Sequence, residues 1–128
     1  MVLLDTNIVI YSVDPHYEQV RRYLATRRYG VSVVTTIEAL GYSGITPEQE
    51  ADLREVMVSG RILELTAEVV ERAIRLRQSR KMKLGDSIIA ATALVAGVEL
   101  ATRNEEDFRG ISGLRVVNPV DTAADIKP

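Results

Sequence analysis

The chain has no cysteine and a single histidine, His16. Without cysteine, a disulfide framework, a thiolate zinc site, an iron–sulfur cluster and a cysteine nucleophile are all excluded, and one histidine rules out a His-rich metal cage. No apolar run approaches the ~20 residues that a membrane-spanning helix needs, and the N-terminal residues carry no charged segment typical of a signal peptide. These absences indicate a soluble cytoplasmic protein with no membrane partner.

The chain also has no marked excess of positive or negative charge. The chain has 16 basic and 18 acidic residues and a formal net charge of −2, which argues against a uniformly basic nucleic-acid binder. The average hides segregation, however, because a run of basic residues from Arg72 to Lys83 contains no acidic residue, and the next one is Asp86. The net charge therefore does not identify the partner.

The 128 residues, 46% of them hydrophobic, suffice for one domain with an ordinary core. Short β-rich runs alternate with helical segments, which is the pattern of an α/β domain. Strands are expected at 2–4, 31–34, 61–65, 98–101 and 114–117. We predict a three-layer α/β/α domain over residues 1–120, with a central, mostly parallel sheet of four to five strands. A tail at 121–128 follows, and fraying is expected from Asn118 onward.

Capping residues mark the starts of the expected helices. A helix over 87–96 is apolar nearly all round and therefore buried, and Gly97 suits its C-terminal end. The expected cap residues are Thr6, Asp14 (followed by Pro15), Thr35 or Thr36, Thr46, Thr66 and Asp86.

Acidic residues stand where these elements begin and end. Asp5 follows the first strand, and Glu38 is expected in the first turn of the helix after the second strand. Asp86 stands at the start of the buried helix, and Asp107 lies in the segment after the fourth strand. Because the ligand crevice of an open parallel sheet lies outside the carboxyl ends of its strands, Asp5, Glu38 and Asp107 are expected to converge there, and Asp86 joins them if its helix begins on that side.

Converging carboxylates favour a divalent cation. Carboxylates a few ångströms apart repel one another, and protonation or a cation relieves that repulsion. Oxygen ligands without histidine or cysteine favour Mg²⁺ or Mn²⁺. Water on such an ion has a lowered pKa and can attack phosphorus, and a second ion would steady the leaving oxygen. We therefore consider Asp5, Glu38 and Asp86 as metal ligands and Asp107 as a further catalytic acid.

Each of these acids also has a simpler explanation. Asp86 could cap its helix, Glu38 could be a first-turn acid favoured by the helix dipole, and Asp107 could be an ordinary loop acid. Asp5 is harder to dismiss, because a carboxylate directly after a buried strand needs a compensating partner.

Polar and basic neighbours could support the acids. Asn7 and Thr102 could orient the carboxylates by hydrogen bonds or act as local caps. The basic stretch containing Arg80, Lys81 and Lys83 could hold phosphates near Asp86 or form a solvated helix end.

The same positions carry a resemblance to a known family. The segments 3–8 (Leu-Leu-Asp-Thr-Asn-Ile), 35–38 (Thr-Thr-Ile-Glu), 84–93 (Leu-Gly-Asp-Ser-Ile-Ile-Ala-Ala-Thr-Ala) and 100–108 (Leu-Ala-Thr-Arg-Asn-Glu-Glu-Asp-Phe) resemble the successive motifs of PIN-domain ribonucleases. Within that family the chain is most similar to the VapC toxins of prokaryotic type II toxin–antitoxin modules. The resemblance extends from residue 2 to about 120.

The resemblance implies a Mg²⁺- or Mn²⁺-dependent endoribonuclease with an acidic pocket of Asp5, Glu38, Asp86 and a fourth group. Relatives often have an acid at the position of Asn104, where an amide oxygen can ligate Mg²⁺ but adds no charge. Either Asn104 or Asp107 could fill that fourth position. The family also implies a homodimer and a cognate antitoxin that packs into a groove on the toxin. Apolar residues that could line the groove are Ile8, Val9, Tyr11, Ala51, Leu53, Val56 and Met57.

Two other function classes remain open. A phosphatase or receiver domain would use Asp5 as a nucleophile, but such phosphatases usually carry a second Asp where this chain has Asn7. A non-catalytic binding module would keep the fold and the partner groove, and Asn104 in place of an acid favours it.

Overall fold

The computed structural model describes residues 1–121 of the chain. Five strands form one sheet in which every pair is parallel, in the order β3-β2-β1-β4-β5. The strands are β1 (Val2–Leu4), β2 (Tyr29–Ser32), β3 (Arg61–Leu63), β4 (Glu99–Ala101) and β5 (Val116–Val117). The α/β prediction is confirmed, and the sheet is all-parallel.

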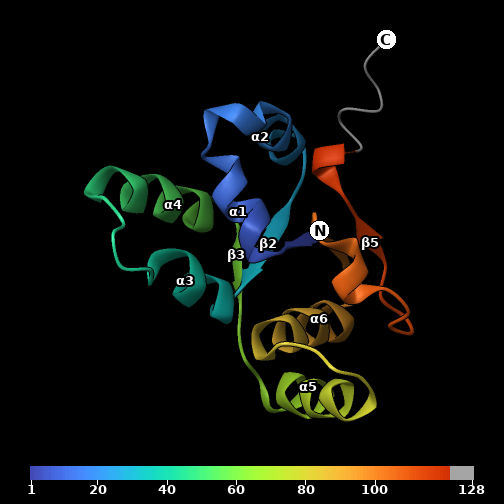
Figure 1. Ribbon diagram of the computed structural model, residues 1–128. Coiled ribbons are helices and arrows are strands. Elements are labelled where there is room, and N and C mark those ends of the chain that lie inside the picture. The colour runs from blue at the N-terminus through green and yellow to red at the C-terminus, as the bar shows by residue number, and fades with distance from the viewer. Residues whose placement is uncertain (122–128) are drawn as a thin grey trace.

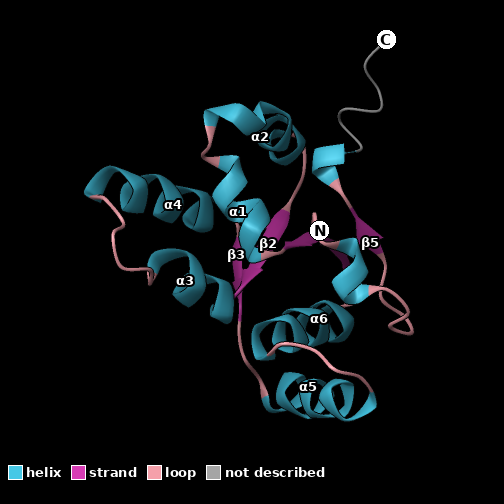
Figure 2. Ribbon diagram, viewed as in Figure 1, coloured by secondary structure: helices cyan, strands magenta, loops and turns pink. Residues whose placement is uncertain are grey.

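Helices cover both faces of the sheet. Figure 1 shows α1 (Thr6–Ser12), α2 (Glu18–Ala25) and α4 (Pro47–Ser59) on one side, and α5 (Ala67–Ser79) and α6 (Leu84–Ala96) on the other. Figure 2 shows the strands between these two layers. Successive side chains of β1 point to opposite faces of the sheet, so they enter two separate hydrophobic cores. Val2 and Leu4 pack with α1, α2 and α4, whereas Leu3 packs with α6.

The helix α3 (Val33–Leu40) joins the two helical layers, because it contacts both α1 and α6. It begins earlier than expected. The Ser32 hydroxyl accepts a hydrogen bond from the Val34 amide and caps the helix, so Thr35 lies inside it. For the same reason β2 ends at Ser32, two residues before the expected end of that strand.

Two further cap assignments were wrong. Asp5 rather than Thr6 occupies the N-cap position of α1, and Lys83 rather than Asp86 precedes α6. Three signals held. Thr46 forms the capping box of α4, Thr66 caps α5, and Gly97 ends α6 at a φ of 69°, in the left-handed region.

Asp14 accepts a hydrogen bond from the His16 amide, as expected of a cap. The element that it caps is the short 3-10 helix η1 (Pro15–Tyr17), and α2 follows it. A second 3-10 helix, η2 (Glu105–Phe108), follows β4.

The segment after β5, where partial fraying is expected from Asn118 onward, is folded as far as Asp121. Asn118 and Val120 are buried, and the Asn118 side-chain oxygen accepts hydrogen bonds from the Val120 and Asp121 amides. The remainder of the expected tail, 122–128, lies outside the described residues. No helix in the described part of the chain is long and apolar enough to cross a membrane.

Candidate active site

The strand order changes direction between β1 and β4. Asp5, the residue after β1, contacts Thr102, the residue after β4, at this point. Thr102 Oγ1, after β4, donates a 2.7 Å hydrogen bond to Oδ2 of Asp5, after β1. The Asn104 amide donates to the same Oγ1 at 3.0 Å, so the Thr102 hydroxyl proton is free to point at Asp5. Both side chains are buried. This crevice is where open α/β sheets bind ligands.

Burial shifts the pKa of Asp5. Loss of hydration raises the pKa of Asp5 above its usual value, and the negative charges of Glu38 and Asp107 raise it further. The hydrogen bonds from Thr102 and from the Thr6 backbone oppose that rise. The expectation that Asp5 needs a compensating partner is met by Thr102.

Glu38 is held by a partner that the sequence did not reveal. Thr6 Oγ1 donates to Oε1 of Glu38 at 2.5 Å and lies 3.0 Å from the Thr35 hydroxyl, which joins α1 to α3. Glu38 stands in the second turn of α3, not the first, because the helix begins at Val33. A first-turn role at the helix dipole therefore does not explain it.

Gly85 lets Glu38 approach α6. A Cβ at Gly85 would lie 2.6 Å from Oε2 of Glu38, closer than such atoms approach in proteins. The Glu38 carboxylate therefore rests against the backbone of α6, one residue before Asp86. A glycine at the second position of a helix was the available signal, but the sequence did not show which side chain it admits.

Asp86 lies in a negative field. Its pKa is raised from 3.8 to about 6, first by burial and then by the charges of Asp5 and Asp107, with a smaller contribution from Glu38. Lys83 opposes this rise. Asp86 does not cap α6, so capping does not account for it.

The two candidates for the fourth position differ in role. Asp107 lies exposed on η2, and its charge acts on both Asp5 and Asp86. Asn104 precedes η2 and supports Thr102 through its backbone amide.

The residue types fit a hard divalent ion, but the acids are not assembled as ready ligands. Within residues 1–121, no three histidine, cysteine, aspartate or glutamate side chains form a group that could hold a metal. The charges of Glu38 and Asp107 raise the pKa of both Asp5 and Asp86, and Asp5 further raises that of Asp86, so a cation would relieve this repulsion.

The basic and polar residues predicted to support the acids differ in their contacts. Arg80 donates to the backbone oxygens of Arg109 and Asp107, at 2.5 and 3.4 Å, and Lys83 is near enough to Asp86 to lower its pKa. Lys81 is exposed. The Asn7 side chain makes no hydrogen bond within residues 1–121.

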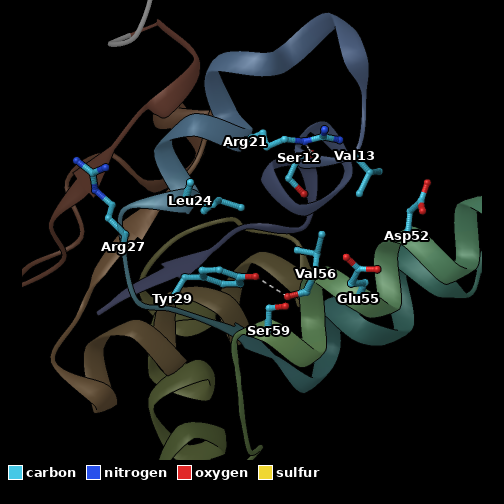
Figure 3. Close-up of a pocket in the computed structure, with 11 residues that line it drawn as sticks. Ser12, Val13, Arg21, Leu24, Arg27, Tyr29, Asp52, Glu55, Val56 and Ser59 are labelled. Atoms are coloured by element: carbon cyan, nitrogen blue, oxygen red, sulfur yellow. Dashed lines mark hydrogen bonds between the residues drawn. The ribbon is translucent and has the colours of Figure 1, made fainter.

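A separate hollow of about 590 Å³ lies away from the acids, between α1, α2, β2 and α4 (Figure 3). Arg21 lies across it from Asp52 and Glu55, so its charge is mixed, whereas the Arg27 guanidinium points away from the hollow and stacks on Tyr23. The Tyr29 hydroxyl donates to the Val56 backbone oxygen at its floor. Of the apolar residues considered for a partner groove, Val56 lines this hollow, whereas Ile8, Val9, Leu53 and Met57 belong to the core.

Comparison with known proteins identifies relatives. A family model described as the PIN domain matches residues 2–114. A toxin–antitoxin complex from Klebsiella pneumoniae contains a similar chain at 34% identity and a TM-score of 0.79, covering 93% of this chain and 98% of that one. No curated protein sequence matches.

Two further solved structures share the fold. FitAcB from Neisseria gonorrhoeae is 26% identical with a TM-score of 0.76, covering 93% of this chain and 98% of that one. VapBC2 from Rickettsia felis, bound to a DNA fragment from its promoter, is 21% identical with a TM-score of 0.80, covering 92% and 98%.

Proposed function

Because the chain belongs to the PIN domain family, we propose that it is a divalent-metal-dependent endoribonuclease and the toxin of a type II toxin–antitoxin pair. The observation that carries the proposal is the set of mutually interacting carboxylates, Asp5, Glu38 and Asp86, at the crevice beside β1 and β4. Asp5 is buried, Asp86 is half-buried and Glu38 is exposed. Repulsion among these carboxylates is a cost that a functional cation would relieve.

Asp5, Glu38 and Asp86 would hold Mg²⁺ or Mn²⁺, with Asp107 completing the site. Mg²⁺ keeps several of its waters, so the carboxylates can hold it partly through water and need not meet at one point. When bound, the ion supplies an activated water that can attack an RNA phosphodiester.

The chain's own residues fix the acids. Thr102 orients Asp5, and Thr6 orients Glu38, each through a hydroxyl that donates to a carboxylate oxygen. Such supporting hydrogen bonds hold ligands in place and tune them. Lys83 offsets part of the negative charge beside Asp86, and we assign phosphate contacts to Lys83, Lys81 and Arg80.

We assign the mixed-charge hollow of Figure 3 to the antitoxin. The relative from K. pneumoniae was solved as a toxin–antitoxin complex. Arg21 on one wall, with Asp52 and Glu55 on the other, would pair with a peptide carrying both charge signs.

A homodimer is the third part of the proposal. Large apolar side chains are exposed near β3, the edge strand of the sheet, and on the adjoining helices. Val58 is 83% exposed, Ile37 66% and Leu84 60%. Exposure of this size favours burial against a second copy of the chain.

The test of the activity is Asp5→Asn. The variant should fold as the parent does and lose Mn²⁺-dependent cleavage of RNA, followed on gels with circular dichroism and thermal unfolding as checks on folding. Asp52→Asn, an exposed aspartate on α4, is the matched control and should cleave normally. Full cleavage by well-folded Asp5→Asn would refute the proposal.

A catalytically impaired binding module is the second candidate. Asn104 in place of an acid favours it, as does the lack of a ready metal-ligand group within residues 1–121. Calorimetric titration with Mn²⁺ separates the two functions. A nuclease binds the ion in an Asp5-dependent manner, whereas a binding module shows no such site.

A further inference from the structure

Two tyrosines and an arginine form a cluster beside the acids that the proposed chemistry does not use. Tyr11 of α1 and Tyr17 of η1 stack with ring centroids 4.1 Å apart and planes 25° apart. Arg103 Nη1 donates to both phenolic oxygens, at 3.3 Å and 3.1 Å. Its guanidinium carbon lies 5.5 and 5.7 Å from the two ring centroids.

The cluster is tied to the acidic crevice through the chain on both sides. Arg103 directly follows Thr102, whose hydroxyl holds Asp5. Tyr11 lies on the helix that begins after Asp5, and a rise of 1.5 Å per residue puts the two roughly 9 Å apart along that helix. A nucleotide next to a phosphate bound through a cation at Asp5 would lie at this range.

The charge of Arg103 is uncompensated. Arg103 is exposed and forms no salt bridge within residues 1–121. Its partners there are two neutral phenols, which position the guanidinium without cancelling its charge. A cation that is held in place but not neutralised suits an anionic ligand.

We propose that Tyr11, Tyr17 and Arg103, here called the aromatic platform, bind a nucleobase and the adjoining phosphate of single-stranded RNA next to the bond that is cleaved. The inference rests on the proposed function and names a substrate-binding subsite for it. Aromatic rings and arginine planes are the surfaces on which proteins stack unpaired bases, and the arginine adds a charge contact. An acidic pocket repels RNA, so an anchor beside it offsets that repulsion.

The experiment measures RNA affinity in the non-cleaving Asp5→Asn background. Fluorescence anisotropy would follow a short, labelled single-stranded RNA of mixed sequence and an abasic oligonucleotide of the same length. Tyr17→Ala and Arg103→Ala should each weaken binding of the RNA about tenfold, as expected for loss of a stacked base. Tyr17→Phe, which keeps the ring, should bind nearly as the parent does.

The chain offers a matched control pair. Arg27 stacks on Tyr23 with its guanidinium carbon 3.9 Å from the ring centroid, beside Val2 at the opposite end of β1. Arg27→Ala removes a similar pair and should leave RNA affinity unchanged. Tyr17→Ala should also leave the affinity for the abasic oligonucleotide unchanged, because no base is present to stack.

Parent-like RNA affinity in Tyr17→Ala and Arg103→Ala would overturn the proposal and leave the cluster as a brace between η1 and the loop after β4. An equal loss of affinity for abasic and normal RNA in Tyr17→Ala would also overturn it. Failure of the nuclease proposal looks different. In that case the unmodified protein does not cleave RNA with Mn²⁺, although platform-dependent RNA binding persists.

Discussion

The Thr102 hydroxyl donates a 2.7 Å hydrogen bond to the carboxylate of Asp5, although 97 residues separate the two in the chain. They meet because β1 and β4 are neighbours and end at the same edge of the sheet. Thr102 thereby stabilises the charged form of Asp5 and lowers its pKa, against the rise that burial causes.

Thr102→Val should shift the pH dependence of cleavage. Without its donor, Asp5 has a still higher pKa, so the acidic limb of the pH–rate profile moves to higher pH. The rate near neutrality should fall about tenfold or more, as for other residues that support metal ligands. Thr102→Ser keeps the hydroxyl and should restore the parental profile, and a profile unmoved in the valine variant would contradict the assignment.

Gly85→Ala should separate stability from activity. Alanine favours the helix by roughly 1 kcal/mol over glycine, so the melting temperature should stay the same or rise. The new methyl group displaces the Glu38 carboxylate, so cleavage should fall. In a Glu38→Ala background Gly85→Ala should have no further effect on cleavage, whereas an additive loss would show that Gly85 acts elsewhere.

Asp86→Asn should stabilise the metal-free protein at neutral pH. Since the folded pKa of about 6 exceeds the ordinary 3.8, ionised Asp86 opposes folding, and this penalty grows as the pH rises between those values and is complete above them. At this partly exposed site we expect a gain of about 1 kcal/mol near pH 7.5.

Thermal unfolding in EDTA measures that effect. The gain should nearly disappear near pH 3, where aspartate is mostly protonated in both folded and unfolded states. Asp52→Asn is the control, because that exposed carboxylate should show no pH-dependent gain. Equal stability of Asp86→Asn and parent at both pH values would argue against a repulsive site.

Asp107→Asn should weaken Mn²⁺ binding, measured by calorimetric titration, because the charge of Asp107 acts on Asp5 and Asp86. Asn104→Ala keeps the backbone amide that donates to Thr102 and should change Mn²⁺ affinity less. Asn104→Asp adds a negative charge and should raise the affinity. The reverse order would place the fourth ligand at Asn104.

The strands, the layers and the buried helix could be predicted because each depends on local composition and periodicity. Asp5, Glu38 and Asp107 could be proposed as one site because parallel strands end at one edge of a sheet. Thr6 was missed because a threonine after a strand resembles a helix cap, and its real partner, Glu38, lies 32 residues away. Gly85 was missed for the same reason, since its lack of a side chain matters only because Glu38 of another helix lies against it.

The order in which the chain supplies these parts has a consequence for its synthesis. β1 lies between β2 and β4, and β4 belongs to the last third of the sequence. A nascent or truncated chain that stops before Glu99 has neither the Thr102 hydroxyl for Asp5 nor the strand β4 beside β1. The acids can therefore become one pocket only late in translation, and an incomplete product should be inert.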